Sequence, residues 1–141
     1  MVVDGLLIPD LLEAMLAEGR WPRTADELSK QHLHSRVPED RNRRLRRICL
    51  YAPPFQTIAR VVAGGGRDFY AGSGALHELV PEVSVAIADF GLGADAPILL
   101  DYRAGPADPR VIHLEWADRG EPNYWVVMAP DFASFVDMLG L

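Results

Sequence analysis

The sequence predicts an α+β domain in which short helices come first and a mainly antiparallel sheet follows. The 141 residues suit a single domain, 1–141, with one core. Apolar residues recur at helical spacing near both ends of the chain, and they alternate in short runs between residues 83 and 129. The connections between these runs are 7–9 residues long and rich in glycine and proline, which suits antiparallel neighbours better than helical crossovers.

The first elements are predicted to be two short helices. One lies between Pro9 and Gly19, because its apolar residues follow helical spacing: Leu11, Leu12, Met15 and Leu16. Thr24 with Glu27 three residues later forms a capping-box pattern, which predicts a second helix over Ala25–Gln31.

The middle of the chain is predicted to be more irregular. Residues 32–45 carry charge without a clean period and are interpreted as a loop. Arg46–Tyr51 alternates and is predicted to be a strand that ends before Pro53. Residues 58–62 predict one or two helical turns, and Gly74–Val80 predicts a further helix.

The second half is predicted to form a four-stranded meander with a covering helix. The strands are Val83–Ala88, Ile98–Tyr102, Val111–Trp116 and Tyr124–Ala129. The third alternates most clearly, so that an apolar face is expected opposite a mixed one. A helix before Gly140 is predicted to pack on the sheet, from apolar residues at i, i+3, i+4 and i+7: Phe132, Phe135, Val136 and Leu139.

Charge and composition narrow the classes of partner. The net charge is −6, but residues 1–70 carry +2 and residues 71–141 carry −8. The second half should therefore repel nucleic acid and attract a basic protein. No apolar run approaches the roughly 20 residues of a membrane helix, and no signal peptide is expected. A single cysteine, Cys49, fits a reducing, cytoplasmic location.

The segment 87–103, IADFGLGADAPILLDYR, resembles the signature of the SUKH superfamily. The resemblance extends through 110–116, 126–129 and 132–141, and LAEGRWP at 16–22 is similar to a bacterial subgroup. It implies a curved, mainly antiparallel sheet of four to six strands with N-terminal and C-terminal helices packed on it. Many bacterial relatives are immunity proteins that neutralise a toxin, often a nuclease, and fungal relatives are cell-wall-synthesis regulators linked to killer-toxin resistance. No catalytic residues are established for the family, and none are carried over.

Acidic residues and one tyrosine form the predicted partner-binding set: Asp89, Asp95, Asp101, Tyr102 and Glu115. Carboxylates beside an aromatic ring suit an arginine- or lysine-rich partner, such as the substrate groove of a nuclease. They lack the spacing of a calcium loop, and no metal site is expected. Gly91 and Gly93 are predicted to allow positive φ in a turn, where Asp89 accepts hydrogen bonds from nearby amides.

The histidines, the cysteine and the arginine cluster are predicted to have structural or surface roles. His113 is expected to be half-buried and hydrogen-bonded, Cys49 to be a buried thiol, and His77 to be exposed. The arginines of residues 36–47 are expected to form a solvated face or to pair with the acidic half.

The sequence thus favours a protein-binding domain, and the resemblance to the SUKH superfamily implies an immunity-type protein that neutralises a basic toxin or nuclease by stoichiometric binding. Such a domain needs no cofactor and is expected to be a monomer or a weak homodimer. Two alternatives stay open at this point: a regulatory or scaffold domain without a toxin, and a small enzyme that uses an acidic cleft.

Overall fold

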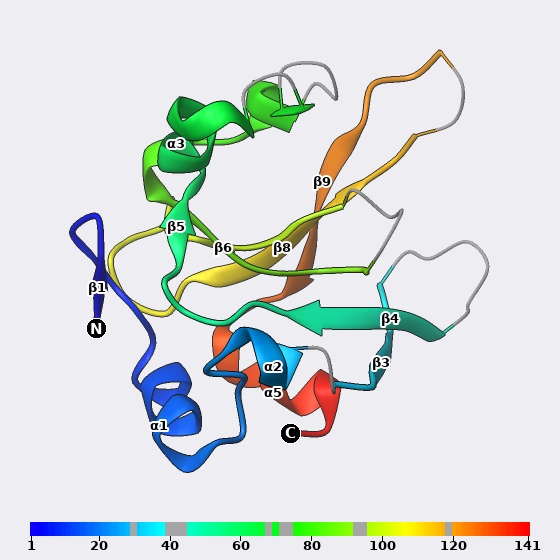
Figure 1. The fold of residues 1–141 in the computed structure, drawn as a ribbon. Coiled ribbons are helices and arrows are strands. Elements are labelled where there is room, and N and C mark those ends of the chain that lie inside the picture. Colours follow the sequence, from blue (N-terminus) through cyan, green and yellow to red (C-terminus); the bar gives the residue numbers. More distant parts are fainter. Residues whose placement is uncertain (29–30, 39–44, 67–68, 71–74, 92–95, 118–119) are drawn as a thin grey trace.

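The sheet is antiparallel in every described pairing and has helices on both sides (Figure 1). The computed structural model describes the whole chain apart from residues 29–30, 39–44, 67–68, 71–74, 92–95 and 118–119. The strand order is β3-β4-β6-β7-β8-β9, and β5 pairs with β6 on the same edge as β4. The predicted α+β class with a mainly antiparallel sheet is therefore confirmed, and the described strands of this sheet number seven, where four to six were predicted.

The strands of the sheet are β3 (Leu33–Arg36), β4 (Leu45–Leu50), β5 (Gln56–Thr57), β6 (Ser84–Asp89), β7 (Ile98–Asp101), β8 (Arg110–Glu115) and β9 (Tyr124–Ala129). A separate hairpin at the N-terminus is formed by β1 (Val2–Val3) and β2 (Leu6–Leu7). The α-helices are α1 (Asp10–Glu18), α2 (Ala25–Leu28), α3 (Ile58–Val61) and α5 (Phe132–Leu139). Shorter turns of helix are η1 (Val62–Gly66), η2 (Ala75–Glu78) and η3 (Pro81–Val83).

The sheet is covered on both faces, which explains why its central strands lack a polar side. All four residues of β7 are buried, and its three apolar residues alternate between two apolar clusters. Ile98 and Leu100 join the cluster that contains α1 and α5, whereas Leu99 joins the cluster that contains α3. Burying an aliphatic side chain of this size contributes about 1.5–3 kcal/mol. The predicted alternation of β8 is observed, since Val111 lies in the first cluster and Ile112 and Leu114 lie in the second, but both faces are buried from Val111 to Leu114.

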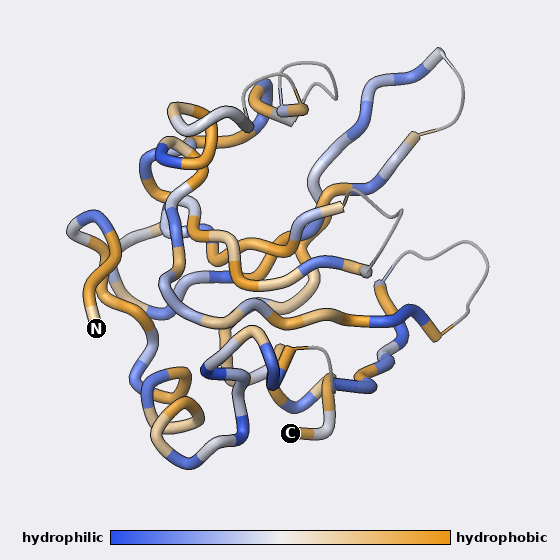
Figure 2. The backbone as a smooth tube through the Cα atoms, in the orientation of Figure 1, coloured by the Kyte–Doolittle hydropathy of each residue, from blue (hydrophilic) through white to orange (hydrophobic). Residues whose placement is uncertain are grey.

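The distribution of hydrophobic residues along the chain agrees with a sheet that is covered on both faces. Figure 2 shows the hydrophobic stretches along the central strands, whereas the distal end of the β8–β9 hairpin is hydrophilic. None of the helices described has the length and apolar character that a membrane crossing requires.

Helix ends follow the predicted signals. Gly19 ends α1 and Gly140 ends α5, each in the left-handed conformation that glycine adopts at low cost. The Asp131 carboxylate accepts a hydrogen bond from the Ser134 amide at 2.7 Å and caps α5. Thr24 caps α2 in the same way; α2 is described over Ala25–Leu28, and Gln31, the predicted end, is not helical.

Two strand regions differ from the prediction. Residues 33–36 were expected in a loop, yet they form β3, because Leu33 to Arg36 pair with β4. Tertiary contacts also stabilise this strand, because the Ser35 hydroxyl is buried and donates to the Met138 carbonyl of α5 at 3.0 Å. The predicted helix over 74–80 is a single 3₁₀ turn, η2, and residues 71–74 lie outside the described part of the chain.

The N-terminal hairpin was not predicted at all. Its turn consists of Asp4 and Gly5, both at positive φ (49° and 85°). Asp4 also accepts hydrogen bonds from the Thr57 hydroxyl at 2.8 Å and from Arg60 Nε at 3.1 Å. These contacts fix the hairpin against the start of α3 and place Leu7 beside the groove described below.

Candidate functional site

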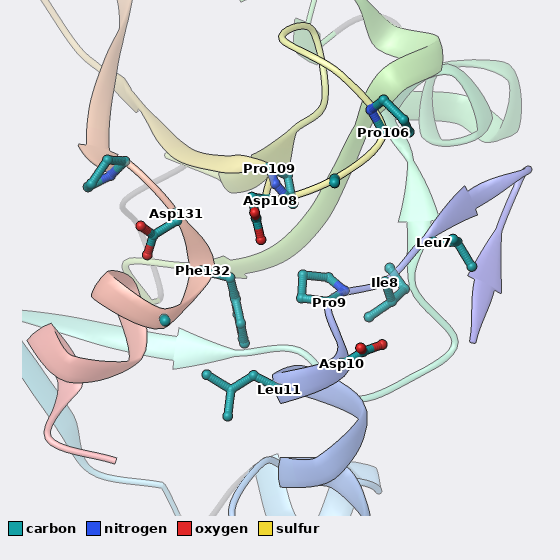
Figure 3. Close-up of a pocket in the computed structure, with 13 residues that line it drawn as sticks. Leu7, Ile8, Pro9, Asp10, Leu11, Pro106, Asp108, Pro109, Asp131 and Phe132 are labelled. Carbon is teal, nitrogen blue, oxygen red and sulfur yellow. The ribbon is translucent and has the colours of Figure 1, made fainter.

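A groove of about 620 Å³ lies where the β2–α1 junction, the β7–β8 loop and the start of α5 meet (Figure 3). Ile8 and Phe132 are buried beneath it, and Figure 3 shows the Phe132 ring directed towards its centre. Leu7 is 63% exposed at one margin. An apolar lining of this size is typical of a site that receives a ligand or a few residues of a partner.

Four prolines stiffen the walls of the groove: Pro9, Pro106, Pro109 and Pro130. Proline has a fixed φ and no N–H, so these walls lose little conformational entropy when a ligand binds. Their rings also offer apolar surface without an unsatisfied donor.

In the described part of the chain, the charged residues that line the groove are all aspartates: Asp10, Asp108 and Asp131. Asp10 lies in the first turn of α1 and is exposed, as is Asp108 in the β7–β8 loop. The hydrogen bond from the Ser134 amide holds the pKa of Asp131 below its ordinary value. A rim lined by carboxylates favours a cationic ligand. We call this site, with its proline walls and aspartate rim, the acidic groove.

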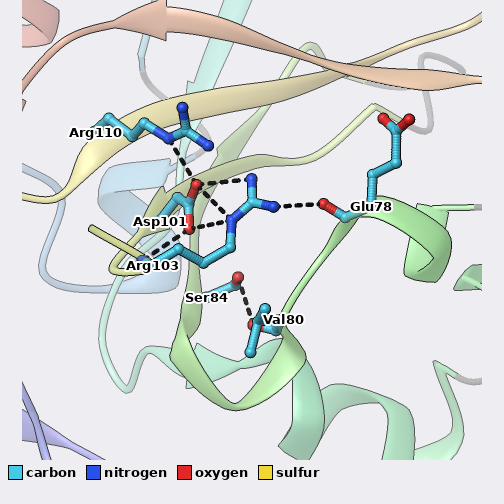
Figure 4. Close-up of polar contacts among 6 residues, drawn as sticks. All are labelled: Glu78, Val80, Ser84, Asp101, Arg103 and Arg110. Carbon is cyan, nitrogen blue, oxygen red and sulfur yellow. Dashed lines mark hydrogen bonds and ion pairs between the residues drawn. The ribbon is translucent and has the colours of Figure 1, made fainter. Parts of the chain in front are cut away.

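One buried carboxylate positions the loop that forms a wall of the acidic groove (Figure 4). The Asp101 side chain is fully buried, and it binds the residues at both ends of the β7–β8 loop. Arg103 Nη2 and Arg110 Nε lie 3.0 Å and 2.8 Å from Asp101 Oδ2. Arg103 also donates to the Glu78 carbonyl at 2.9 Å. The loop that carries Pro106 and Asp108 is thus held at both ends.

The residues that sequence analysis assigned to partner binding are not brought together. Asp101 pairs with Ser84 at the start of β6, whereas Asp89 lies at the other end of that strand. Asp101 and Tyr102 are only 1% and 4% exposed, so their side chains are not at the surface. The Tyr102 hydroxyl donates to the Leu7 carbonyl at 2.7 Å, which ties the N-terminal hairpin to the groove. Burial raises the pKa of Tyr102 well above its usual range.

Asp89, Gly91 and Glu115 lie at the other end of the sheet from Asp101. Asp89 accepts from the Tyr51 hydroxyl at 2.9 Å and from the Gly91 amide at 2.7 Å. Gly91 has a φ of 89°, as a tight turn requires. Glu115 accepts a hydrogen bond from Arg46 at 3.3 Å. Gly93 and Asp95 lie outside the described residues.

Among the described residues, the histidine and cysteine side chains do not form a catalytic arrangement. His113 is fully buried rather than half-buried, with its ring 5.3 Å from that of Phe90. Cys49 is half-buried, and His77 is exposed. Within the described ranges, no three His, Cys, Asp or Glu side chains are grouped so that they could hold a metal ion.

The basic cluster of residues 36–47 is partly neutralised within the molecule. Arg46 pairs with Glu115 and also lies 3.7 Å above the Phe90 ring. Arg41, Arg43 and Arg44 lie outside the described part of the chain.

The residues of the acidic groove were missed by sequence reasoning. Asp10, Asp108 and Asp131 are far apart in the sequence, and each one has a local explanation as a helix-start or turn residue. No family model, no curated protein and no solved structure matches this chain. The geometry of the groove is therefore the main basis for a functional proposal.

Proposed function

We propose that the chain is a protein-binding domain that receives a basic, extended segment of a partner protein in the acidic groove. The observation that carries this proposal is the combination of an apolar floor with a rim whose charges are all carboxylates. A cationic side chain can reach Asp10 or Asp108 at the exposed rim, while its apolar neighbours cover Phe132. The rigid proline walls favour a segment that binds without remodelling the groove.

The proposed biological form of this binding is immunity of the SUKH type, in which the protein neutralises a cognate toxin stoichiometrically. Two features support a basic toxin such as a nuclease. Residues 71–141 carry a net charge of −8, and the groove rim adds Asp10 from the other half of the chain. A nuclease must hold phosphates in a basic substrate groove, and an acidic surface can occupy it.

A direct binding experiment tests the groove. We would titrate the full-length protein with a short synthetic peptide of alternating arginine and leucine, and follow the backbone amide signals by NMR. A peptide with glutamate in place of arginine is the control ligand. The expected result is that signals of the groove walls shift with the arginine peptide only, and that binding weakens as salt is added.

Variants distinguish binding in the acidic groove from attraction to the overall negative charge of the protein. Asp10→Asn with Asp108→Asn removes two exposed rim charges and should weaken peptide binding by about tenfold. Asp137→Asn on the exposed side of α5 is the control and should leave binding unchanged. Equal affinity of the original protein, the double rim variant and the control variant for the peptide would show that the acidic groove is not the binding site.

Affinity capture from source cells then identifies the partner. A partner with a toxin domain, captured in a one-to-one complex that the rim variant weakens, supports immunity. A housekeeping partner captured in the same groove-dependent way would replace immunity with a regulatory role.

A further inference from the structure

The outward face of the N-terminal hairpin is apolar. Val2 and Leu7 are cross-strand partners in β1 and β2, so their side chains lie on the same face, and they are 60% and 63% exposed. Val3 and Leu6 take the opposite face, where Val3 is buried in the apolar cluster that contains α1 and α5, and Leu6 packs against that cluster. Core packing therefore explains the apolar residues of one face only. We call Val2 and Leu7 the hairpin patch.

The hairpin patch is continuous with the acidic groove, because Leu7 belongs to both. Asp10 follows Leu7 by three residues and begins α1. Figure 3 shows Leu7 at one side of the groove and Asp131 at the other, with Asp10 and Asp108 between them. A segment whose cationic side chain reaches the carboxylates in the middle of the groove can therefore extend directly onto the hairpin patch.

Hydrogen bonds fix the hairpin patch in place. The Tyr102 hydroxyl donates to the Leu7 carbonyl at 2.7 Å, and the Ile8 amide donates to the Met1 carbonyl at 3.0 Å. The turn of the hairpin is fixed against the start of α3 through the Asp4 carboxylate. Because the backbone beneath the hairpin patch is already ordered, a ligand that covers the patch loses little affinity to ordering it.

We infer that the basic segment of the partner carries a large apolar residue beside its cationic residue and places it on the hairpin patch. This inference rests on the proposed function, because the carboxylate rim is what identifies the segment as basic. Two aliphatic side chains that face each other across a hairpin can cover another apolar side chain, but they cannot satisfy a polar one. Charge attracts basic segments in general, and the hairpin patch selects among them.

Two peptides of equal charge test this selection. The peptide of alternating arginine and leucine is compared with one in which serine replaces every leucine, and each is titrated into the full-length protein by calorimetry. Val2→Ser with Leu7→Ser removes the hairpin patch without changing the charge of the protein. Leu45→Ser is the matched control, because Leu45 is 61% exposed at the start of β4 and does not line the acidic groove.

The double hairpin variant should bind the leucine peptide about tenfold more weakly than the original protein does. The loss should be equal at low and high sodium chloride, because salt screens the charges of the rim and not an apolar contact. The serine peptide should bind the double hairpin variant and the original protein equally, which also shows that the acidic groove is intact in the variant. Leu45→Ser should bind both peptides like the original protein.

The results distinguish this inference from the proposed function. If Asp10→Asn with Asp108→Asn weakens binding of the leucine peptide and the double hairpin variant does not, the inference is overturned and the proposed function stands. If neither double variant changes the affinity, the proposed function fails, and the inference fails with it. Self-association of the original protein that the double hairpin variant abolishes would assign the hairpin patch to a second copy and would also overturn the inference.

Discussion

Replacing Asp101 by asparagine tests whether one buried carboxylate holds the wall of the acidic groove. The change preserves the side-chain shape and removes the charge that faces Arg103 and Arg110. Removing one partner of a buried ion pair costs about 3–5 kcal/mol when the other charge stays buried. Here the two arginine side chains are 32% and 37% exposed, so water recovers part of the loss. We expect the free energy of unfolding to fall by about 2–3 kcal/mol.

The effect should also depend on pH with a defined sign. Burial alone would raise the pKa of Asp101, but hydrogen bonds from Arg103 and Arg110 outweigh it and hold the pKa below the ordinary 3.8. A depressed pKa stabilises the fold above the unfolded-state pKa, and this stabilisation is lost as the pH falls through the folded-state pKa. The difference in unfolding free energy between the original protein and Asp101→Asn should therefore be constant near neutral pH and shrink below about pH 4.

Equilibrium unfolding in urea, repeated from neutral to acidic pH, measures both effects. Asp137→Asn is the control, because Asp137 is exposed on α5. A double-mutant cycle of Asp101→Asn with Arg110→Met isolates the coupling between these two side chains. The reasoning would be refuted if Asp101→Asn lost no more stability than Asp137→Asn, or if the loss grew as the pH fell.

Three further substitutions should change the urea midpoint by different mechanisms. Trp21→Phe removes a fully buried indole and its 2.8 Å hydrogen bond to the Tyr51 carbonyl, and should cost about 2–3 kcal/mol. Gly91→Ala places a Cβ at a φ of 89° and should cost about 1–2 kcal/mol, whereas Gly64→Ala meets no atom within 4 Å and should stay within about 0.5 kcal/mol. Asp131→Ala removes the α5 cap and should lower the free energy of unfolding by about 1 kcal/mol. Asp131→Ser should retain most of the stabilisation, because a serine side chain can also cap a helix. A uniform loss across these variants and their controls would contradict all three assignments.

Elements with a strong local pattern were predicted well. Residues 124–129 form β9 with the predicted bounds, because that run is apolar and lies between turn residues. α5 begins after Asp131 and ends at Gly140, because the cap, the apolar spacing and the terminal glycine all agree. The N-terminal hairpin carried a usable signal in Asp4-Gly5, since this dipeptide favours the positive φ values of a two-residue turn.

Other features depend on contacts that no local pattern encodes. Leu33–Arg36 has a polar composition and becomes a strand only because β4 offers it a partner. In the sequence, Asp101 cannot be distinguished from the other regularly spaced aspartates. In the structure its side chain is buried, because Arg103 and Arg110 pair with its carboxylate. The acidic groove combines three segments that only the tertiary fold brings together.

The burial and pairing of individual carboxylates determine which of them can attract a cationic partner. Residues 71–141 carry a net charge of −8, but their carboxylates are not equally available: Asp101 is buried between Arg103 and Arg110, and Glu115 pairs with Arg46. A carboxylate paired with a nearby cation contributes little field beyond a Debye length of about 8–10 Å. Asp10 and Asp108 are exposed at the groove rim, and none of the described residues that line the groove is basic. A cationic partner should therefore be attracted most strongly to the acidic groove, even though the regular aspartate spacing points elsewhere.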